Sequence, residues 1–243
     1  MWILNSTFVQ FYKESDVYAL LRIFTLEIKM TSEINLKLYA ITDSSWLNGD
    51  TLAHQVELAI EGGATIVQLR EKNKSGEELK ALAIEVKNVC DKHNVTFIIN
   101  DDVELAKEID ADGVHVGQSD TSVENARKIL GPDKIIGATA KTVEQAKIAS
   151  NQGADYLGSG AVFGSTTKKD AIPMSMELLN EICDSVPIPV VAIGGIDKHN
   201  IARLRGTHIA GAAVVSGIFA QPDIKKAAQE LSEELLVICE ENV

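Results

Sequence analysis

The 243-residue chain predicts an α/β fold, a (β/α)8 TIM barrel, because short apolar segments alternate with helical segments along it. Eight segments have the composition of strands, and they lie at 36–42, 64–69, 95–99, 113–116, 134–138, 155–158, 188–193 and 210–215. Junctions such as GGATIV and GADYLG carry the glycine that ends a helix before the next strand. Such alternation produces a parallel sheet with right-handed crossovers. Eight units in about 210 residues match the size of this barrel.

An open, doubly wound sheet is the alternative for the same order of elements. Its dinucleotide-binding form carries a GxGxxG motif after the first strand, and the sequence after residue 42 lacks that motif. The barrel is therefore the preferred prediction.

The predicted helices begin at residues that commonly cap helix ends. Ser75 and Thr121 are each followed three residues later by glutamate, which is the spacing of a capping box. The full set of expected caps is Asp50 or Thr51, Ser75, Asp102, Thr121 and Thr142. Further helices are expected near 176–183, 197–206 and 222–239.

The first 29 residues are expected to be an N-terminal extension, either helical or poorly ordered. Residues 2–12 are moderately apolar, but no positively charged segment precedes them and no small-residue cleavage site follows, so a signal peptide is not predicted. Residues 30–243 are expected to form one catalytic barrel domain.

The amino-acid composition of the chain excludes some classes of binding partner. A formal net charge of −12 disfavours nucleic-acid binding, because an acidic surface repels a phosphate backbone. Any site that binds a phosphate group must therefore be formed by a few residues that lie close together, because the chain as a whole repels anions. No apolar run reaches the roughly 18 residues that a membrane span needs. Three widely separated cysteines without metal-binding spacing indicate reduced thiols and a cytoplasmic location. The sequence leaves open whether the chain forms a homo-oligomer.

Polar residues follow nearly every predicted strand. In a barrel, the carboxyl ends of the strands meet at one rim, where active sites form. Gln68, Arg70 and Lys72 alternate at the end of the second strand, where they either face solvent or meet an anion. The other residues at strand ends are Asn100, Asp101, Asp120, Thr139, Ser165, Thr166, Thr167, Lys168, Gly194, Gly195, Val215 and Ser216.

Asp101 and Asp120 follow adjacent strands and carry the hard oxygen ligands that Mg²⁺ prefers, together with substrate phosphate oxygens. The competing interpretation of Asp120 is a helix cap, and Asp102 is the better candidate for the cap after the third strand. Gly194 and Gly195 allow close approach of backbone to a second phosphate. No histidine pattern suggests a nucleophile, and His115 is expected to be a hydrogen-bonded barrel residue, so electrostatic stabilisation of a leaving group is favoured.

These residues lie in segments that resemble thiamine phosphate synthase. The matching segments are LYAITD, GGATIVQLREK, FIINDDVELA, ADGVHVGQSD, GADYLGSGAVF, TTKKDA, VAIGGI and AAVVS, in family order across residues 36–218. The resemblance implies a (β/α)8 barrel that joins hydroxymethylpyrimidine diphosphate to hydroxyethylthiazole phosphate and releases pyrophosphate.

The resemblance also implies a role for each matched residue. Asp101 and Asp120 would bind Mg²⁺, and the catalytic cations would be Arg70, Lys72 and Lys168. The pyrimidine diphosphate would be held by these cations with Gln68, Asn100 and Thr139, and by backbone contacts from Leu69 and Glu71. The thiazole phosphate would be held by Ser165, Thr166, Thr167, Gly195, Val215 and Ser216. The implied mechanism is dissociative, with pyrophosphate leaving before the thiazole nitrogen attacks.

Two departures and two alternatives accompany the resemblance. Gly164-Ser165 stands where the family usually has a proline-threonine step, and Ala161 stands where proline is common, which bears on affinity for thiazole phosphate. The alternatives are an isomerase related to the thiazole tautomerases and a non-catalytic binding protein for thiazole phosphate or thiamine phosphate. Neither alternative requires the metal pair with Lys168.

Overall fold

The computed structural model describes residues 34–164 and 173–240 of the chain. Within them, parallel strands pair in chain order and the last pairs with the first, which closes a barrel. The strands are β1 (Leu38–Ile41), β2 (Ile66–Leu69), β3 (Thr96–Asn100), β4 (Gly113–Val116), β5 (Ile135–Thr139), β6 (Tyr156–Gly160), β7 (Val190–Ile193) and β8 (Gly211–Val214). The predicted TIM barrel is confirmed. The extension proposed at residues 1–29 and its boundary lie outside the described residues.

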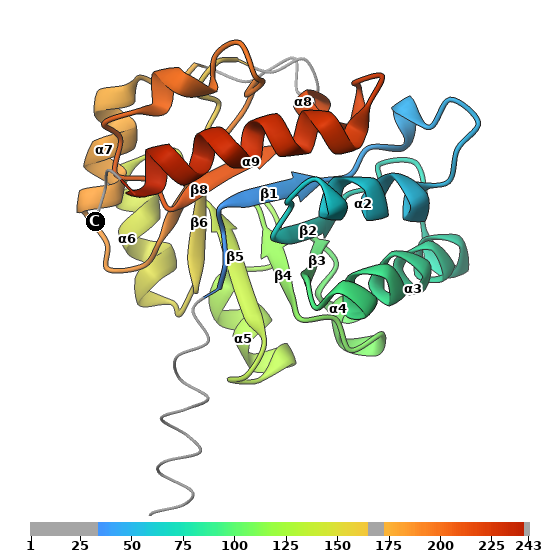
Figure 1. Ribbon diagram of the computed structural model, residues 1–243. Coiled ribbons are helices and arrows are strands. Elements are labelled where there is room, and N and C mark those ends of the chain that lie inside the picture. The colour runs from blue at the N-terminus through green and yellow to red at the C-terminus, as the bar shows by residue number, and fades with distance from the viewer. Residues whose placement is uncertain (1–33, 165–172, 241–243) are drawn as a thin grey trace, which may run out of the picture. The chain divides into compact units, whose positions relative to one another are not determined.

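Helices separate the strands and lie outside them (Figure 1). The α-helices are α2 (Leu52–Glu61), α3 (Gly76–His93), α4 (Val103–Glu108), α5 (Val123–Leu130), α6 (Val143–Asn151), α7 (Met176–Asp184), α8 (Ser216–Phe219) and α9 (Ile224–Glu240). Two short 3-10 helices are η1 (Ser44–Trp46) and η2 (Ile201–Leu204). The sequence did not predict η1 or α8. In the part of the chain that the structure describes, no helix is long and apolar enough to cross a membrane.

Three of the predicted helix caps are confirmed by hydrogen bonds. Thr51, Asp102 and Thr142 each accept a bond from the backbone N–H three residues later, at 3.2, 2.9 and 3.2 Å. These bonds satisfy N–H groups that have no acceptor inside the helix.

The two predicted capping boxes are wrong. Ser75 occupies the cap position of α3 without a side-chain bond, and Glu78 pairs with Lys74 instead. At α5 the cap is Ser122 rather than Thr121, and Glu124 pairs with Lys128 at 2.6 Å. In both cases a lysine four residues away in the sequence pairs with the glutamate carboxylate that the box would have used.

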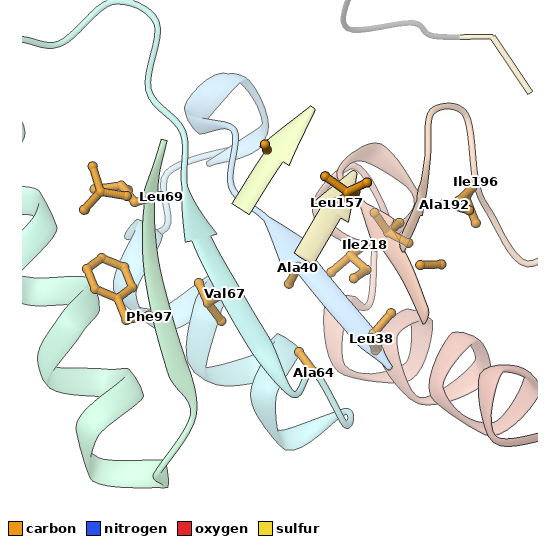
Figure 2. Close-up of a cluster of buried hydrophobic side chains, with 14 of the residues drawn as sticks. Leu38, Ala40, Ala64, Val67, Leu69, Phe97, Leu157, Ala192, Ile196 and Ile218 are labelled. Atoms are coloured by element: carbon orange, nitrogen blue, oxygen red, sulfur yellow. The ribbon is translucent and has the colours of Figure 1, made fainter. Parts of the chain in front are cut away.

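The main apolar core lies between the outer face of the strands and the helices. Leu38, Ala40, Val67, Phe97 and Leu157 belong to it, and Figure 2 shows them on their strands. Successive strand side chains point to opposite faces, so every second residue of each strand enters this layer. The remaining strand residues face the barrel interior.

The barrel interior contains both apolar and polar side chains. Ile66, Ile98 and Val191 are buried there beside two tyrosines, Tyr39 and Tyr156, whose hydroxyl oxygens lie 2.7 Å apart. A buried hydroxyl is tolerated when it has a hydrogen-bond partner. The interior is therefore a packed layer with a polar centre.

The last described helix, α9, packs against α2 where the barrel closes. Helix α9 packs on α2, β1 and β8, as Figure 1 also shows. Gly62 follows α2, and a Cβ atom there would lie 2.3 Å from the carbonyl oxygen of Lys225 in α9. The close approach of the two backbones requires glycine at this position.

Candidate active site at the carboxyl ends of the strands

Gln68 lies inside the barrel near the end of β2. Its side chain is 2% exposed, and Nε2 donates a hydrogen bond to the Tyr39 hydroxyl at 2.8 Å. Because β2 ends at Leu69, strand alternation does not extend to Arg70 and Lys72 as predicted. The Arg70 backbone N–H donates to Thr42 Oγ1 at 3.0 Å, which attaches this segment to the end of β1. Arg70 is half-buried and Lys72 is exposed, so both belong to the rim loop.

Leu69 and Glu71 differ from their neighbours in direction. Leu69 belongs to the apolar core outside the barrel, so only its backbone is available to a ligand at the rim. One carboxylate oxygen of Glu71 is buried without a hydrogen-bond partner among the described residues, and burial raises the pKa of this carboxyl group. This burial leaves the backbone of Glu71 for the predicted substrate contact.

Asn100 and Asp101 form a linked pair at the end of β3. The Asn100 Nδ2 atom donates to Asp101 Oδ2 at 2.6 Å, and the Asp101 N–H donates to the carbonyl oxygen of His115 at 2.8 Å. Asp101 has a positive φ of 64°, a conformation that is uncommon outside glycine. Since Asp102 caps α4, the helix does not use the Asp101 carboxylate.

Asp120 closes the turn after β4. Its Oδ2 accepts the Gly117 N–H at 2.9 Å, and its own N–H donates to the Gly117 carbonyl at 3.3 Å. Because Ser122 caps α5, the alternative interpretation of Asp120 as the helix cap is wrong. Gln118 Nε2 donates to the Thr139 carbonyl at 2.6 Å, which attaches the same loop to the end of β5.

Thr139 is the last residue of β5. Its Oγ1 atom lies 3.0 Å from His115 Nε2, and the two atoms share a hydrogen bond. His115 Nδ1 lies 3.1 Å from the Tyr156 hydroxyl, so both ring nitrogens have partners, as expected for a barrel histidine. Sequence reasoning missed Tyr39 and Tyr156. The strand alternation of LYAIT and DYLG could have placed both rings inside the barrel.

The loops after β6, β7 and β8 meet at the opposite part of the rim. Gly194 and Gly195 have positive φ of 106° and 66°, and a Cβ on Gly195 would lie 2.6 Å from the Phe163 carbonyl oxygen. Val215 occupies the cap position of α8 and Ser216 begins it. The predicted residues Ser165, Thr166, Thr167 and Lys168 lie outside the described residues.

Asp101 and Asp120 fit the ligand preference of Mg²⁺. Among residues 34–164 and 173–240, no group of three or more His, Cys, Asp or Glu residues could hold a metal by itself. Mg²⁺ usually needs fewer, because one or two carboxylates are completed by phosphate oxygens and waters. Each carboxylate has one oxygen oriented by a neighbour, Asn100 or the Gly117 backbone, as supporting contacts orient metal ligands.

Comparison with known proteins gives a consistent result. A family model described as thiamine monophosphate synthase matches residues 38–218. The thiamine-phosphate synthase of Clostridium tetani is 47% identical over 199 residues, which are 82% of this chain and 95% of that protein. The enzyme of the same name from Ruminiclostridium cellulolyticum is 50% identical over 204 residues, covering 84% and 97%.

A solved structure agrees with these relatives. The thiamine phosphate pyrophosphorylase from Pyrococcus furiosus superposes with a TM-score of 0.78 at 38% sequence identity, covering 85% of this chain and 98% of that one. The family match at residues 38–218 covers all the strands of the barrel and the rim residues at their carboxyl ends. The chain belongs to the thiamine monophosphate synthase family, whose members are transferases of thiamine biosynthesis.

Proposed function

We propose that this enzyme joins hydroxymethylpyrimidine diphosphate to hydroxyethylthiazole phosphate, and that it forms thiamine phosphate and pyrophosphate with the help of Mg²⁺. The observation that carries the proposal is the pair Asp101 and Asp120. They follow the neighbouring strands β3 and β4, and each has one carboxylate oxygen oriented by a hydrogen bond. Two oriented carboxylates on the same barrel rim as Arg70 and Lys72 suit a metal-bound diphosphate.

The diphosphate would bind at the rim of β2, β3 and β5. Arg70 and Lys72 supply positive charge after β2, and Lys168 would add a third cation. Arginine binds phosphate through paired N–H groups, whereas lysine acts as a point charge. Gln68, Asn100 and Thr139 would contact the same substrate through side chains, and Leu69 and Glu71 through the backbone.

The thiazole phosphate would bind at the rim of β6, β7 and β8. The positive φ of Gly195 turns the backbone where a side chain would collide with Phe163. Val215 and Ser216 bring the first N–H groups of α8 to the same edge, where barrels commonly bind phosphate. Ser165, Thr166 and Thr167 would add hydroxyl donors.

In the proposed dissociative mechanism, the carbon–oxygen bond to the diphosphate breaks first and its electron pair leaves with pyrophosphate. Arg70, Lys72 and Lys168 stabilise the charge on the leaving group. The ring nitrogen of the thiazole then attacks the pyrimidine methylene cation. Bound Mg²⁺ would supply further neutralisation of the phosphate charge. The carbon–nitrogen bond requires no general base, because the attacking nitrogen carries no proton.

The isomerase and the non-catalytic binding protein remain the competing functions. An isomerase of a thiazole phosphate would act on one substrate and would release no pyrophosphate. A binding protein would retain phosphate affinity without turnover. Neither function requires the acidic pair at β3 and β4, so the presence of this pair favours the synthase.

Pyrophosphate release tests the three functions together. Purified protein is mixed with each substrate alone and with both, with Mg²⁺ or with EDTA, and pyrophosphate and thiamine phosphate are measured. We expect both products only in the complete mixture. Pyrophosphate release that needs neither Mg²⁺ nor thiazole phosphate would exclude the proposal, and thiazole conversion without pyrophosphate would favour the isomerase.

A further inference from the structure

A continuous chain of hydrogen bonds crosses the barrel interior between Gln68 and Thr139. Gln68 Nε2 lies 2.8 Å from the Tyr39 hydroxyl, which lies 2.7 Å from the Tyr156 hydroxyl. Tyr156 then lies 3.1 Å from His115 Nδ1, and His115 Nε2 lies 3.0 Å from Thr139 Oγ1. The five side chains come from β2, β1, β6, β4 and β5. Both ends of this chain are substrate contacts in the proposed function.

The chemistry of the first bond fixes the direction of the others. An amide NH₂ group can only donate, so the Tyr39 oxygen accepts from Gln68. Among the described residues, Tyr156 is the partner that remains for the Tyr39 proton, and Tyr156 in turn donates to His115 Nδ1. His115 therefore carries its proton on Nε2 and donates it to Thr139 Oγ1.

The hydrogen-bond directions at Gln68 and at Thr139 are therefore coupled to each other. With this polarity, Gln68 keeps its carbonyl oxygen as an acceptor, and Thr139 keeps its own hydroxyl proton as a donor. Turning the Gln68 amide would require every bond in the chain to reverse, because each hydroxyl has one proton to give. The orientation of one substrate contact thus sets the orientation of the other.

Both tyrosines are suited to act as neutral donors. Tyr39 is 1% exposed and Tyr156 is 0% exposed, and burial raises the pKa of each phenol above its ordinary value. Each hydroxyl therefore retains its proton throughout the neutral pH range.

Glycines on neighbouring strands leave room for the rings. Gly137 of β5 pairs with His115 on one side and with Tyr156 on the other. A Cβ on Gly137 would lie 2.1 Å from Tyr156 Cζ, and a Cβ on Gly158 would lie 3.2 Å from His115 Cε1. The strands are thus shaped around this polar chain, which argues against an incidental contact.

We propose that Tyr39, Tyr156 and His115 are positioning residues for the pyrimidine substrate. They hold Gln68 as an acceptor and Thr139 as a donor at the rim, and they do so without contributing atoms to the reaction. The inference rests on the proposed function, because that function assigns Gln68 and Thr139 to this substrate.

The test uses Tyr156→Phe, which removes one hydroxyl, keeps the ring and interrupts the chain at its middle. We expect KM for the pyrimidine diphosphate to rise about 5- to 30-fold, the factor for losing one orienting hydrogen bond, and KM for the thiazole phosphate to stay unchanged. In a Thr139→Val background, Tyr156→Phe should raise this KM by a smaller factor than in the wild type, because only the Gln68 end of the chain is left to lose its orientation.

Ser159→Ala is the matched control. Ser159 lies on the same strand, is 0% exposed, and its Oγ has no hydrogen-bond partner among the described residues. Removing this buried hydroxyl should leave both KM values unchanged. If Tyr156→Phe does not fold, Tyr39→Phe interrupts the same chain at the neighbouring bond and should give the same selective rise.

A spectroscopic measurement separates this inference from the proposed function. Nitrogen NMR of the wild-type enzyme should show His115 protonated on Nε2, and Tyr156→Phe should remove that preference. A wild-type proton on Nδ1, or an unchanged KM for the pyrimidine diphosphate in the variant, overturns the positioning role while synthase activity stands. Loss of the synthase assignment would instead appear as a wild-type enzyme that releases no pyrophosphate.

Discussion

Three consecutive polar residues after β3 have separate tasks. Asn100 orients Asp101 through a 2.6 Å hydrogen bond, Asp101 has a left-handed backbone, and Asp102 caps α4. A non-glycine residue at positive φ costs free energy, on the order of 1–3 kcal/mol in strained cases. The cost at Asp101 is consistent with a carboxylate that is held for a ligand rather than for the helix.

Replacing neighbouring aspartates distinguishes these tasks. We expect Asp101→Asn to lower turnover by more than about 100-fold, because the variant removes charge while asparagine tolerates the left-handed backbone. Steady-state pyrophosphate release measures the effect. Asp102→Ala is the control: it should cost about 1 kcal/mol of unfolding free energy through the lost cap, with turnover near the wild-type value. Equal losses of turnover in both variants would contradict the division of tasks.

The sequence predicted the rim residues better than the barrel interior. The positions of Asp101, Asp120 and Thr139 at or just after the carboxyl ends of strands could be predicted, because a change from apolar to polar residues marks the approximate end of a strand; their roles toward a ligand stay predictions. Strand alternation could have placed the rings of Tyr39 and Tyr156 inside the barrel, but it could not pair their hydroxyl groups, since an aromatic residue inside a strand is ordinarily apolar packing. Their hydroxyl contact joins residues 117 positions apart and becomes visible only when the barrel is closed.

At the scale of single elements, two helices that both have a hydroxyl residue at the cap position begin differently. Thr51 caps α2 with a 3.2 Å hydrogen bond, whereas Ser75 occupies the same position of α3 without one. We expect Thr51→Ala to lower the unfolding free energy by about 1 kcal/mol and Ser75→Ala to lower it by clearly less. Urea denaturation of the two variants measures the difference, and an equal loss would mean that the observed caps do not determine helix stability.

Helices α2 and α3 are joined by an ion pair that depends on pH. Lys92 and His93 of α3 hold the pKa of Glu57 in α2 down to about 2, from an ordinary value of 4.5. A carboxyl group with a depressed folded pKa stabilises the fold above its unfolded pKa, and it loses this contribution as pH falls toward the folded value. The affected window therefore runs from about pH 4.5 down to about pH 2.

Glu57→Gln should remove the acid-sensitive part of this link. We expect the wild type to be more stable than the variant at pH 7, and the difference to shrink as the pH falls through that window. Thermal unfolding at a series of pH values measures it. Glu144→Gln on α6 is the control, because no salt bridge joins Glu144 to another described residue. Parallel pH curves for the wild type and Glu57→Gln would refute the expectation.

The order of strands and helices was predictable, while some ends and short pieces were not. Some predicted strands extend beyond the paired residues, as 36–42 does around β1 at Leu38–Ile41, whereas 155–158 ends before the last residue of β6, Gly160. Apolar composition continues past the last ladder bond, so it does not locate a strand end. Helix α8 has four residues, too few to show a helical period in the sequence.

At the scale of the whole barrel, stability depends on contacts between the beginning and the end of the described chain. Strand β1 pairs with β8, and α2 packs on α9 with Glu61 and Lys225 joined at 2.8 Å. The backbones of α2 and α9 also approach closely at Gly62, since a methyl group there would meet a carbonyl oxygen that belongs to α9.

The substitution Gly62→Ala should therefore weaken the packing of α2 against α9. We expect it to lower the unfolding free energy by about 1–3 kcal/mol through overpacking, although alanine is ordinarily the better residue at a negative φ. Denaturant melts give the value. Lys147→Ala, an exposed change on α6, should stay within about 0.5 kcal/mol of the wild type. A stabilised Gly62→Ala variant would show that the two backbones can separate at no cost.

The pairing of β1 with β8 also has a consequence for synthesis on the ribosome. About 170 residues separate the two strands, so at typical translation speeds β1 waits roughly 10 to 30 seconds for its second partner. During that interval the nascent sheet has two open edges, and such edges invite pairing with other chains. The enzyme acquires a closed rim, and with it the proposed activity, only after β8 has been synthesised, so a nascent chain truncated before β8 is an aggregation hazard rather than a partly working catalyst.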